Sequence, residues 1–378
     1  MKYYIIAGEA SGDLHASNLM RALKEVDKDA EFRCYGGEKM EAAGGFLVKN
    51  YKETAVMGFL TVLKNLDKIK ANMDYAKSDI KEWNPDVMIF VDYPGFNLRI
   101  AEYTHKIGIK NYYYISPKIW AWKKWRIKAI RKYIDEMFCI FPFEVDFFKD
   151  LNYKVHYEGN PLVDEISKKL EKERIANIDI REANNLDERP IISLLAGSRI
   201  QELKTSIPEM LKVVDKYPDY QFVIAGAPSL TMEDYKPIIG DKNVKIVFDQ
   251  TYGLLINSRA ALVTSGTATL ETALLGTPQV VCYKTFGGAF IYHLMKAILN
   301  IKFVSLVNII MQKQVVVELL QHHFCERLII KELDKILKDG EPREKMLKDY
   351  KDLSNSLGEK GVSERFANRI YKLLKQDK

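Results

Sequence analysis

The chain has 378 residues, of which 47% are hydrophobic and 29% charged. This length accommodates two ordinary domains, and the composition excludes a largely disordered chain. The formal net charge of +6 is mild, so it suits an anionic substrate or a membrane surface without identifying either.

The cysteines and the apolar segments suggest a cellular context. Cys34, Cys139, Cys282 and Cys325 are widely spaced and form no C-x-x-C pair, which argues against a zinc knot or a disulfide framework. The N-terminus passes directly into strand-like sequence, and no uninterrupted apolar stretch of roughly 20 residues follows. We therefore expect a cytoplasmic protein with reduced thiols and, at most, peripheral membrane contact.

The first half alternates short apolar runs with amphipathic stretches. The runs YYIIA, DVMIFVD and NYYYIS are followed by helical periodicity over 14–25, 97–107 and 119–133. Continuous β-branched and aromatic runs are typical of parallel strands covered on both faces. This pattern predicts a βαβ domain over residues 1–170.

A charged stretch, 164–189, separates this half from the next and is typical of a surface helix and connector. After it, the runs PIISLLAG, YQFVIAG, VKIVF, AALVTSG and PQVVCYK predict further strands, separated by helical stretches. We expect a second βαβ domain over 171–345, linker included. A C-terminal helix over 346–378 is expected to pack back on the first domain.

The first strand leads into GEASGD, residues 8–13. A glycine-bearing turn between strand and helix often binds phosphate, but Glu9 and Asp13 would repel a diphosphate. Because carboxylates accept hydrogen bonds from sugar hydroxyls, the turn favours an acceptor or sugar contact that includes Ser11 and Gly12. The alternative is that Asp13 caps its helix while Glu9 is solvated.

Another strand ends at Asp92, within VDYPGFN. Pro94 and Gly95 force a turn before the next helix. Partial shielding by Tyr93 and Phe96 would raise the pKa of the Asp92 carboxyl toward a value useful for a general base. The same carboxylate could instead cap the following helix or form the turn.

Two segments of the first half mix apolar and basic side chains. Residues 118–133 interleave three tryptophans with lysines and arginines, and residues 55–73 have the pattern of an interfacial helix. Single-stranded nucleic acid, or ordinary helices with buried apolar faces, are the alternatives. The expected membrane contacts are Met57, Phe59, Leu60, Leu63 and Trp125.

Two strand-end loops in the second half suit a nucleotide diphosphate. SGTATLETALLGTP places a glycine at a helix start, where free N–H groups and the helix dipole favour anions, although a simple N-cap is the alternative. In LLAGSRIQELK, the arginine can bind phosphate oxygens bidentately. Neither loop matches a P-loop or a G-x-G-x-x-G fingerprint. The expected donor contacts in these loops are Ser198, Arg199, Glu202, Ser265, Gly266, Thr267 and Glu271.

Seven motifs resemble those of lipid-A-disaccharide synthases in order and approximate spacing, from about residue 1 to 321. They are GEASGD, VDYPGFN, SPKIWAW, GNPL, LLAGSRIQE, SGTATLETALLGTP and SLVNIIMQKQVVVELLQ. The resemblance implies an inverting α/β glycosyltransferase of GT-B architecture, with two Rossmann-like doubly wound domains facing each other across a cleft and no metal or other cofactor. It implies transfer of diacylglucosamine from UDP to the 6-hydroxyl of diacylglucosamine 1-phosphate, through a β-1,6 bond.

The resemblance also implies residue roles. Asp92 is similar to the family's essential acidic residue and candidate base, Glu9 to a further polar active-site residue, and Arg199 to a donor-diphosphate contact. Asn308, in SLVN, is similar to an asparagine near the donor. Asn97, in VDYPGFN, joins the expected acceptor or sugar contacts.

The chain departs from the family's LPN and RE patterns at Val307 and at Lys313 and Gln314, so no contact is assigned there. The resemblance implies peripheral location on the inner face of the cytoplasmic membrane and no nucleic-acid partner. It leaves the oligomeric state open, with a homodimer among the options. The remaining alternatives are a UDP-sugar epimerase, a glycosyltransferase with a soluble acceptor, or a basic nucleic-acid-binding protein.

Overall fold

The computed structural model describes residues 1–54, 66–176, 179–284 and 302–376. The chain forms two compact units. Unit 1 comprises Met1–Asp164 and Leu357–Lys378, and unit 2 comprises Glu165–Ser356. The first boundary therefore lies near the start of helix α9 (Leu162–Ala176), rather than at residue 170, because most of this helix belongs to unit 2.

Unit 1 is built on a seven-stranded parallel sheet in the order β3-β2-β1-β4-β5-β6-β7. This order starts in the middle and winds outward in both directions, as in a Rossmann-like domain. The strands are β1 (Lys2–Ala7), β2 (Glu31–Gly36), β3 (Phe46–Asn50), β4 (Val87–Val91), β5 (Lys110–Tyr114), β6 (Glu136–Cys139) and β7 (His156–Tyr157).

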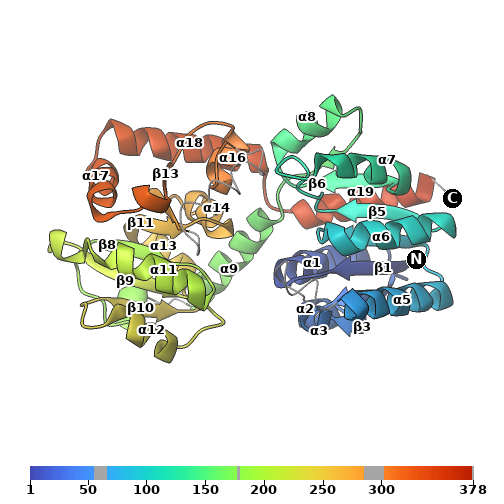
Figure 1. Cartoon of the computed structure of the whole chain (residues 1–378), viewed down its shortest axis with the longest axis horizontal. Helices are drawn as coiled ribbons and strands as arrows, with labels where there is room; N and C mark the ends of the chain where they lie inside the picture. The colour runs from blue at the N-terminus through green and yellow to red at the C-terminus, as the bar shows by residue number, and fades with distance from the viewer. Residues whose placement is uncertain (55–65, 177–178, 285–301, 377–378) are drawn as a thin grey trace. The chain divides into compact units, whose positions relative to one another are not determined.

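Alternation along the central strands divides the core of unit 1 into two layers. In β1, Tyr3 and Ile5 join one apolar cluster, whereas Tyr4 and Ile6 join the other. Because both faces of the sheet are buried, these strands are apolar throughout. Figure 1 shows the helices around this sheet. They are α1 (Ala10–Val26), α2 (Glu38–Ala42), α3 (Tyr51–Thr54), α5 (Leu66–Trp83), α6 (Pro94–Lys106), η1 (Lys124–Arg126), α7 (Ile127–Tyr133), α8 (Pro142–Asp150) and α19 (Val362–Gln376).

Unit 2 repeats this plan with a six-stranded parallel sheet in the order β10-β9-β8-β11-β12-β13. Its strands are β8 (Ile191–Leu195), β9 (Gln221–Gly226), β10 (Lys245–Phe248), β11 (Ser258–Thr264), β12 (Gln279–Tyr283) and β13 (Val317–Leu320). Besides most of α9, its helices are α10 (Ile180–Ala183), α11 (Ile200–Leu211), η2 (Val214–Lys216), α12 (Met232–Ile239), α13 (Thr251–Ile256), α14 (Thr267–Leu274), α16 (Leu306–Met311), η3 (Gln321–His323), α17 (Glu326–Leu337) and α18 (Glu341–Leu357).

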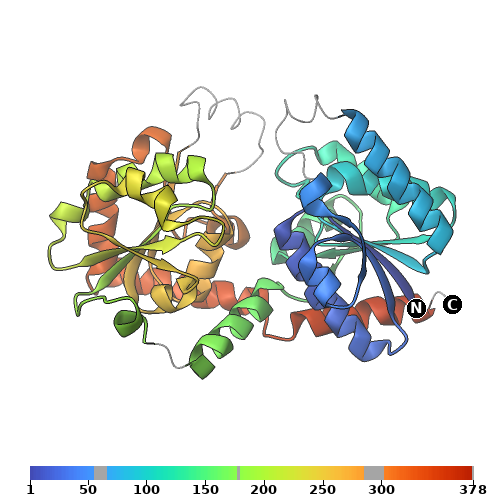
Figure 2. The ribbon, with the colours of Figure 1, turned by 90° about the horizontal axis from the view of Figure 1, so that it is seen from below.

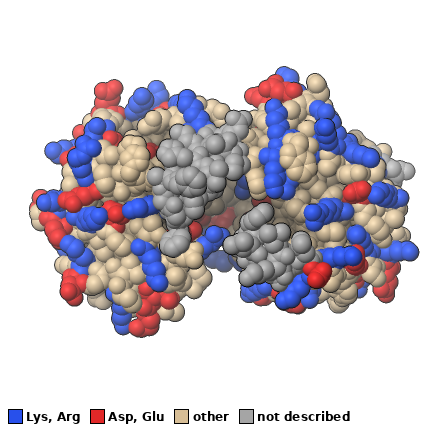
Figure 3. Space-filling view, viewed as in Figure 1, with Lys and Arg blue, Asp and Glu red and all other residues tan. Residues whose placement is uncertain are grey.

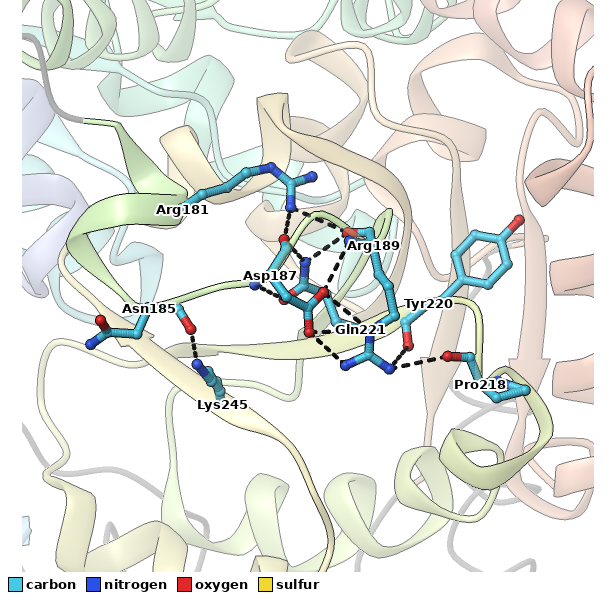
Figure 4. A network of polar contacts seen from close by, with 8 residues as sticks. All are labelled: Arg181, Asn185, Asp187, Arg189, Pro218, Tyr220, Gln221 and Lys245. Carbon is cyan, nitrogen blue, oxygen red and sulfur yellow. Dashed lines mark hydrogen bonds and ion pairs between the residues drawn. The ribbon is translucent and has the colours of Figure 1, made fainter.

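A polar network joins the connector before β8 to the amino end of β9 (Figure 4). Arg189 forms an ion pair with Asp187 at 2.7 Å and donates hydrogen bonds to the carbonyl oxygens of Pro218 and Tyr220. The amide of Gln221 donates to the carbonyl oxygens of Asp187 and Arg189, both at 2.6 Å. The network lies at the amino end of the strands, so it fixes the sheet opposite the edge where ligands bind in such folds.

The chain returns to unit 1 through α19. The expected single helix over 346–378 is two helices, because Gly358 and Gly361 adopt positive φ angles between α18 and α19. The carboxylate of Asp164 accepts hydrogen bonds from the backbone N–H groups of Gly361, Val362 and Ser363 at the start of α19. Figure 2 shows α19 alongside the N-terminal elements of unit 1, where it packs on α1.

Candidate active site

Asp92 follows β4 in a strained turn. Asp92 and Tyr93 have φ angles of 43° and 48°, in the left-handed region that side chains with a Cβ seldom adopt. The Asn97 amide donates to the Asp92 carbonyl oxygen at 2.8 Å, and the Tyr113 hydroxyl donates to the same oxygen. These two hydrogen bonds hold the Asp92 carbonyl oxygen and so help to fix the backbone of the turn.

The Asp92 carboxylate is accessible but poorly solvated. Its side chain is 22% exposed, and one oxygen lies 3.7 Å from the Lys118 Nζ. Burial raises the pKa of the Asp92 carboxyl, the Lys118 charge lowers it, and the Glu9 carboxylate raises it again. A carboxylate with a raised pKa, still reachable from solvent, can accept a proton from a bound hydroxyl group.

The GEASGD turn divides into an exposed and a buried part. Glu9 is exposed, and its carboxylate accepts a hydrogen bond from the Ser11 hydroxyl at 2.7 Å. Asp13 is buried and accepts from the N–H groups of Gly37, Lys39 and Met40. It therefore anchors the amino end of α2.

Two other predicted sugar contacts are also buried. A Cβ at Gly12 would lie 3.2 Å from that of Ala7, so glycine allows α1 to approach β1 closely. Asn97 is fully buried beneath Asp92. The sugar contacts predicted for Gly12, Asp13 and Asn97 stay predictions, while the structure gives these residues packing and anchoring roles.

The segment after β5 is a pinned loop as far as Lys123, and the helix expected over 119–133 covers only its later part, as η1 and α7. Buried Glu144 accepts hydrogen bonds from the Ser116 hydroxyl at 2.7 Å and the Trp120 indole at 3.1 Å. Burial raises the pKa of Glu144 to about 7, against the opposing effect of these donors. The 3-10 turn η1 begins only after Lys123, whose φ of 55° interrupts helical backbone.

Trp125 in η1 is 66% exposed. The other predicted membrane contacts, Met57, Phe59, Leu60 and Leu63, lie outside the described residues. In the part of the chain that the structure describes, no helix has the length and apolar character needed to span a membrane.

Unit 2 contains a pocket of about 490 Å³ at the carboxyl end of its sheet. This volume lies within the range of small-molecule sites. The pocket brings together the two loops singled out in the sequence and adds the end of β9 and the start of α13. Its predicted lining residues are Ser198, Arg199, Glu202, Ser265, Gly266, Thr267 and Glu271.

The pocket has a cationic side chain and an open helix start. Arg199 is exposed at the N-cap of α11, where Glu202 accepts a hydrogen bond from the Ser198 N–H at 2.9 Å. Gly266, with a φ of 146°, is the N-cap of α14 and, as a glycine, has no side chain to cap this helix. Its first N–H groups can therefore bind an anion.

A second acidic group in the pocket is held in place by a tyrosine. The Tyr252 hydroxyl donates to the Glu271 carboxylate at 2.6 Å. Burial and Glu271 raise the Tyr252 pKa, so its hydroxyl remains a donor. The oriented carboxylate can accept hydrogen bonds from sugar hydroxyls.

Asn308 is not among the residues that line this pocket. It is fully buried, and its amide donates to the Val316 carbonyl oxygen and the Glu318 carboxylate, both at 2.9 Å. Glu318 binds the N–H of Val304, whose carbonyl oxygen accepts from the Ser265 hydroxyl. Asn308 therefore supports a pocket loop indirectly, and its predicted donor contact stays a prediction.

Sequence reasoning missed Lys118, Tyr252 and the loop after β9. Lys118 lies within the SPKIWAW motif, which gives no signal of its proximity to Asp92, and Tyr252 lies in the short helix α13, which carries no motif. The β9 loop could have been found, because it too follows an apolar strand. Among the described residues, no cluster of His, Cys, Asp or Glu could hold a metal ion, and the four cysteines are free thiols.

The fold is shared with a solved putative epimerase and a solved glycosyltransferase. A putative UDP-N-acetylglucosamine 2-epimerase from Listeria monocytogenes superposes with a TM-score of 0.66 at 14% identity, over 99% of this chain and 97% of that chain. The calicheamicin glycosyltransferase CalG4 superposes with a TM-score of 0.64 at 12% identity, over 99% and 98%. Two parallel-sheet α/β domains with these neighbours define a GT-B fold.

Comparisons of sequence identify the family. The model for lipid-A-disaccharide synthetase matches residues 3–369. The lipid-A-disaccharide synthase of Myxococcus xanthus is 34% identical over 98% of this chain and 97% of its own length, and that of Coxiella burnetii is 32% identical over 98% of both. The chain belongs to the lipid-A-disaccharide synthase family and is a glycosyltransferase of lipid A biosynthesis.

Proposed function

We propose that this enzyme transfers 2,3-diacylglucosamine from UDP to the 6-hydroxyl of 2,3-diacylglucosamine 1-phosphate. The products are a β-1,6-linked lipid A disaccharide 1-phosphate and UDP, and the anomeric centre is inverted in one displacement. The observation that carries this proposal is the Asp92 carboxylate, which is accessible, fixed by its backbone and raised in pKa.

Asp92 acts as the general base. Its carboxylate accepts the proton of the acceptor 6-hydroxyl as that oxygen attacks the anomeric carbon of the donor. The exposed pair of Glu9 and Ser11 contacts sugar hydroxyls beside it. Gly12, Asp13 and Asn97 shape this end of unit 1.

The unit 2 pocket holds the UDP part of the donor. The guanidinium of Arg199 and the amino end of α14 near Gly266 stabilise the negative charge that develops on the departing diphosphate. Glu271 accepts hydrogen bonds from ribose hydroxyls. A UDP-GlcNAc 2-epimerase from Neisseria meningitidis with a TM-score of 0.64, bound to UDP-GlcNAc, supports a UDP-sugar donor for this fold.

The enzyme works peripherally on the inner face of the cytoplasmic membrane, where acylated sugars are found. Trp125 and Trp122 are exposed among the cations of residues 118–133. Exposed indoles favour the headgroup region, and the cations favour anionic lipid. Met57, Phe59, Leu60 and Leu63 are proposed to add apolar contacts.

Product analysis by mass spectrometry tests the reaction. The purified enzyme is mixed with both acylated sugars in detergent micelles containing EDTA, and we expect disaccharide 1-phosphate and UDP. The nearly isosteric Asp92→Asn variant should bind UDP but lose most turnover. Epimerised UDP-sugar, or transfer that ignores the acyl chains, would contradict the proposal.

A further inference from the structure

Arg126, at the end of η1, has an unusual environment for a cationic side chain near the surface. It is half-buried, within electrostatic range of Asp92, Tyr113 and Arg99. Within the described residues, its guanidinium donates no hydrogen bond to a carbonyl or carboxylate oxygen. Five N–H donors therefore stand available beside the proposed base.

The neighbours of Arg126 add positive charge. Burial and the like charge of Arg126 lower the pKa of Lys123. The Lys123 Nζ lies 4.0 Å from the Trp122 ring centroid. Arg126 also lies over this ring, at 5.8 Å. Residues 116–133 contain no Asp or Glu. Figure 3 shows Lys and Arg outnumbering acidic residues on the visible face of unit 1.

The cluster lacks an internal counter-charge of its own. The nearby carboxylate, Asp92, already interacts with Lys118. Burial lowers the pKa of Arg126, Tyr113 and Asp92 raise it in part, and the like charge of Arg99 lowers it further. Holding these cations together costs free energy in the empty enzyme, whereas a bound dianion would offset it.

We infer that Arg126 and Lys123, which share the Trp122 ring, bind the phosphomonoester of the acceptor sugar beside Asp92. This inference rests on the proposed function, and it gives the acceptor phosphate a protein partner. The planar Arg126 fork binds two phosphate oxygens, and Lys123 balances part of the remaining charge. The site thereby distinguishes the phosphorylated acceptor from an acylated sugar without phosphate.

A pair of acceptors tests this site in detergent micelles. Transfer is measured to diacylglucosamine 1-phosphate and to diacylglucosamine. Arg126→Ala should lower kcat/KM for the phosphorylated acceptor about 10- to 100-fold relative to the unphosphorylated one. Arg126→Lys should lose part of this preference, and Lys149→Ala, at an exposed position on α8, should keep it. Because Arg126 also affects Asp92, the ratio between acceptors is the decisive value.

The lipid headgroup is the other source of the same chemistry. Equal loss with both acceptors, together with weaker binding to phosphatidylglycerol vesicles, would assign the anion to lipid and overturn the inference. Calorimetric titration with glucosamine 1-phosphate and with glucosamine is independent of turnover. If the phosphorylated sugar binds more tightly than glucosamine and Arg126→Ala abolishes this preference, the phosphate site stands even if no disaccharide forms and the proposed function fails. No such preference would overturn it.

Discussion

At the residue scale, the environment of Asp92 combines opposing charges. Lys118 favours its carboxylate form, while burial and Glu9 favour its protonated form. The sequence predicted an acid at this strand end, since its neighbours are a buried strand and a proline turn. It could not predict Lys118, because the distance between their atoms depends on how the 116–123 loop is pinned.

Lys118 and Glu9 should shift the pH dependence of turnover in opposite directions. Lys118→Met removes a cation that lowers the Asp92 pKa. The acidic limb of the profile of kcat/KM against pH should therefore move to higher pH by about half to one unit. Glu9→Gln removes an anion that raises this pKa, so the limb should move to lower pH. Profiles of kcat/KM against pH measure both shifts. Coincident midpoints for all three proteins would remove Asp92 as the titrating base.

Arg199 should contribute mainly to donor binding. Arg199→Ala removes the guanidinium of the pocket, and we expect about 10- to 100-fold weaker binding of UDP, as for a lost charge-assisted hydrogen bond. Calorimetric titration with UDP measures the change. Lys204→Ala, which removes one exposed charge from the same helix, serves as the control and should bind UDP normally. Unchanged affinity in Arg199→Ala would exclude the proposed contact.

At the scale of elements, the 116–123 loop shows what periodicity cannot reveal. Its apolar residues are spaced as in a helix, yet the loop is held by Glu144 of α8, a residue distant in sequence. The strands before Asp92 and before the two unit 2 loops were predictable, because each is a continuous apolar run. The strand β7, with two residues, is too short for such a signal.

Glu144→Gln should loosen this loop. One Glu144 oxygen accepts from Ser116 and Trp120, and the other accepts from the N–H groups of Ile140 and Phe141. In a glutamine, one of these two oxygens is replaced by an NH₂ group, which would face hydrogen-bond donors and could accept from none of them. We expect a loss of about 1 to 3 kcal/mol in the free energy of unfolding. Urea unfolding monitored by tryptophan fluorescence tests this, and stability equal to the parent protein would contradict it.

At the scale of the whole molecule, unit 1 depends on residues from the end of the chain. Phe366 is fully buried in the same cluster as Tyr3 and Ile5, with its ring 5.1 Å from that of Tyr114. The sequence predicted that a C-terminal helix packs on the first domain. The sequence analysis did not predict the break between α18 and α19, although Gly358 and Gly361, which adopt positive φ angles there, are a sequence signal for a helix end.

Phe366→Ala should therefore destabilise unit 1 selectively. Removing this buried ring should cost about 3 to 5 kcal/mol. We expect hydrogen exchange to increase in β1 and β5, while peptides of unit 2 and UDP binding stay close to those of the parent protein. The exposed Lys372 on the same helix offers a control, since Lys372→Ala should have a smaller effect. Uniform loosening of both units would contradict this.

The return of α19 also constrains how the protein is made. During translation, residues 1–164 emerge first, but the side chains that close one face of their core, including Val362, Phe366 and Ile370, follow only after unit 2. Until then the nascent first half exposes an apolar surface where α19 will pack.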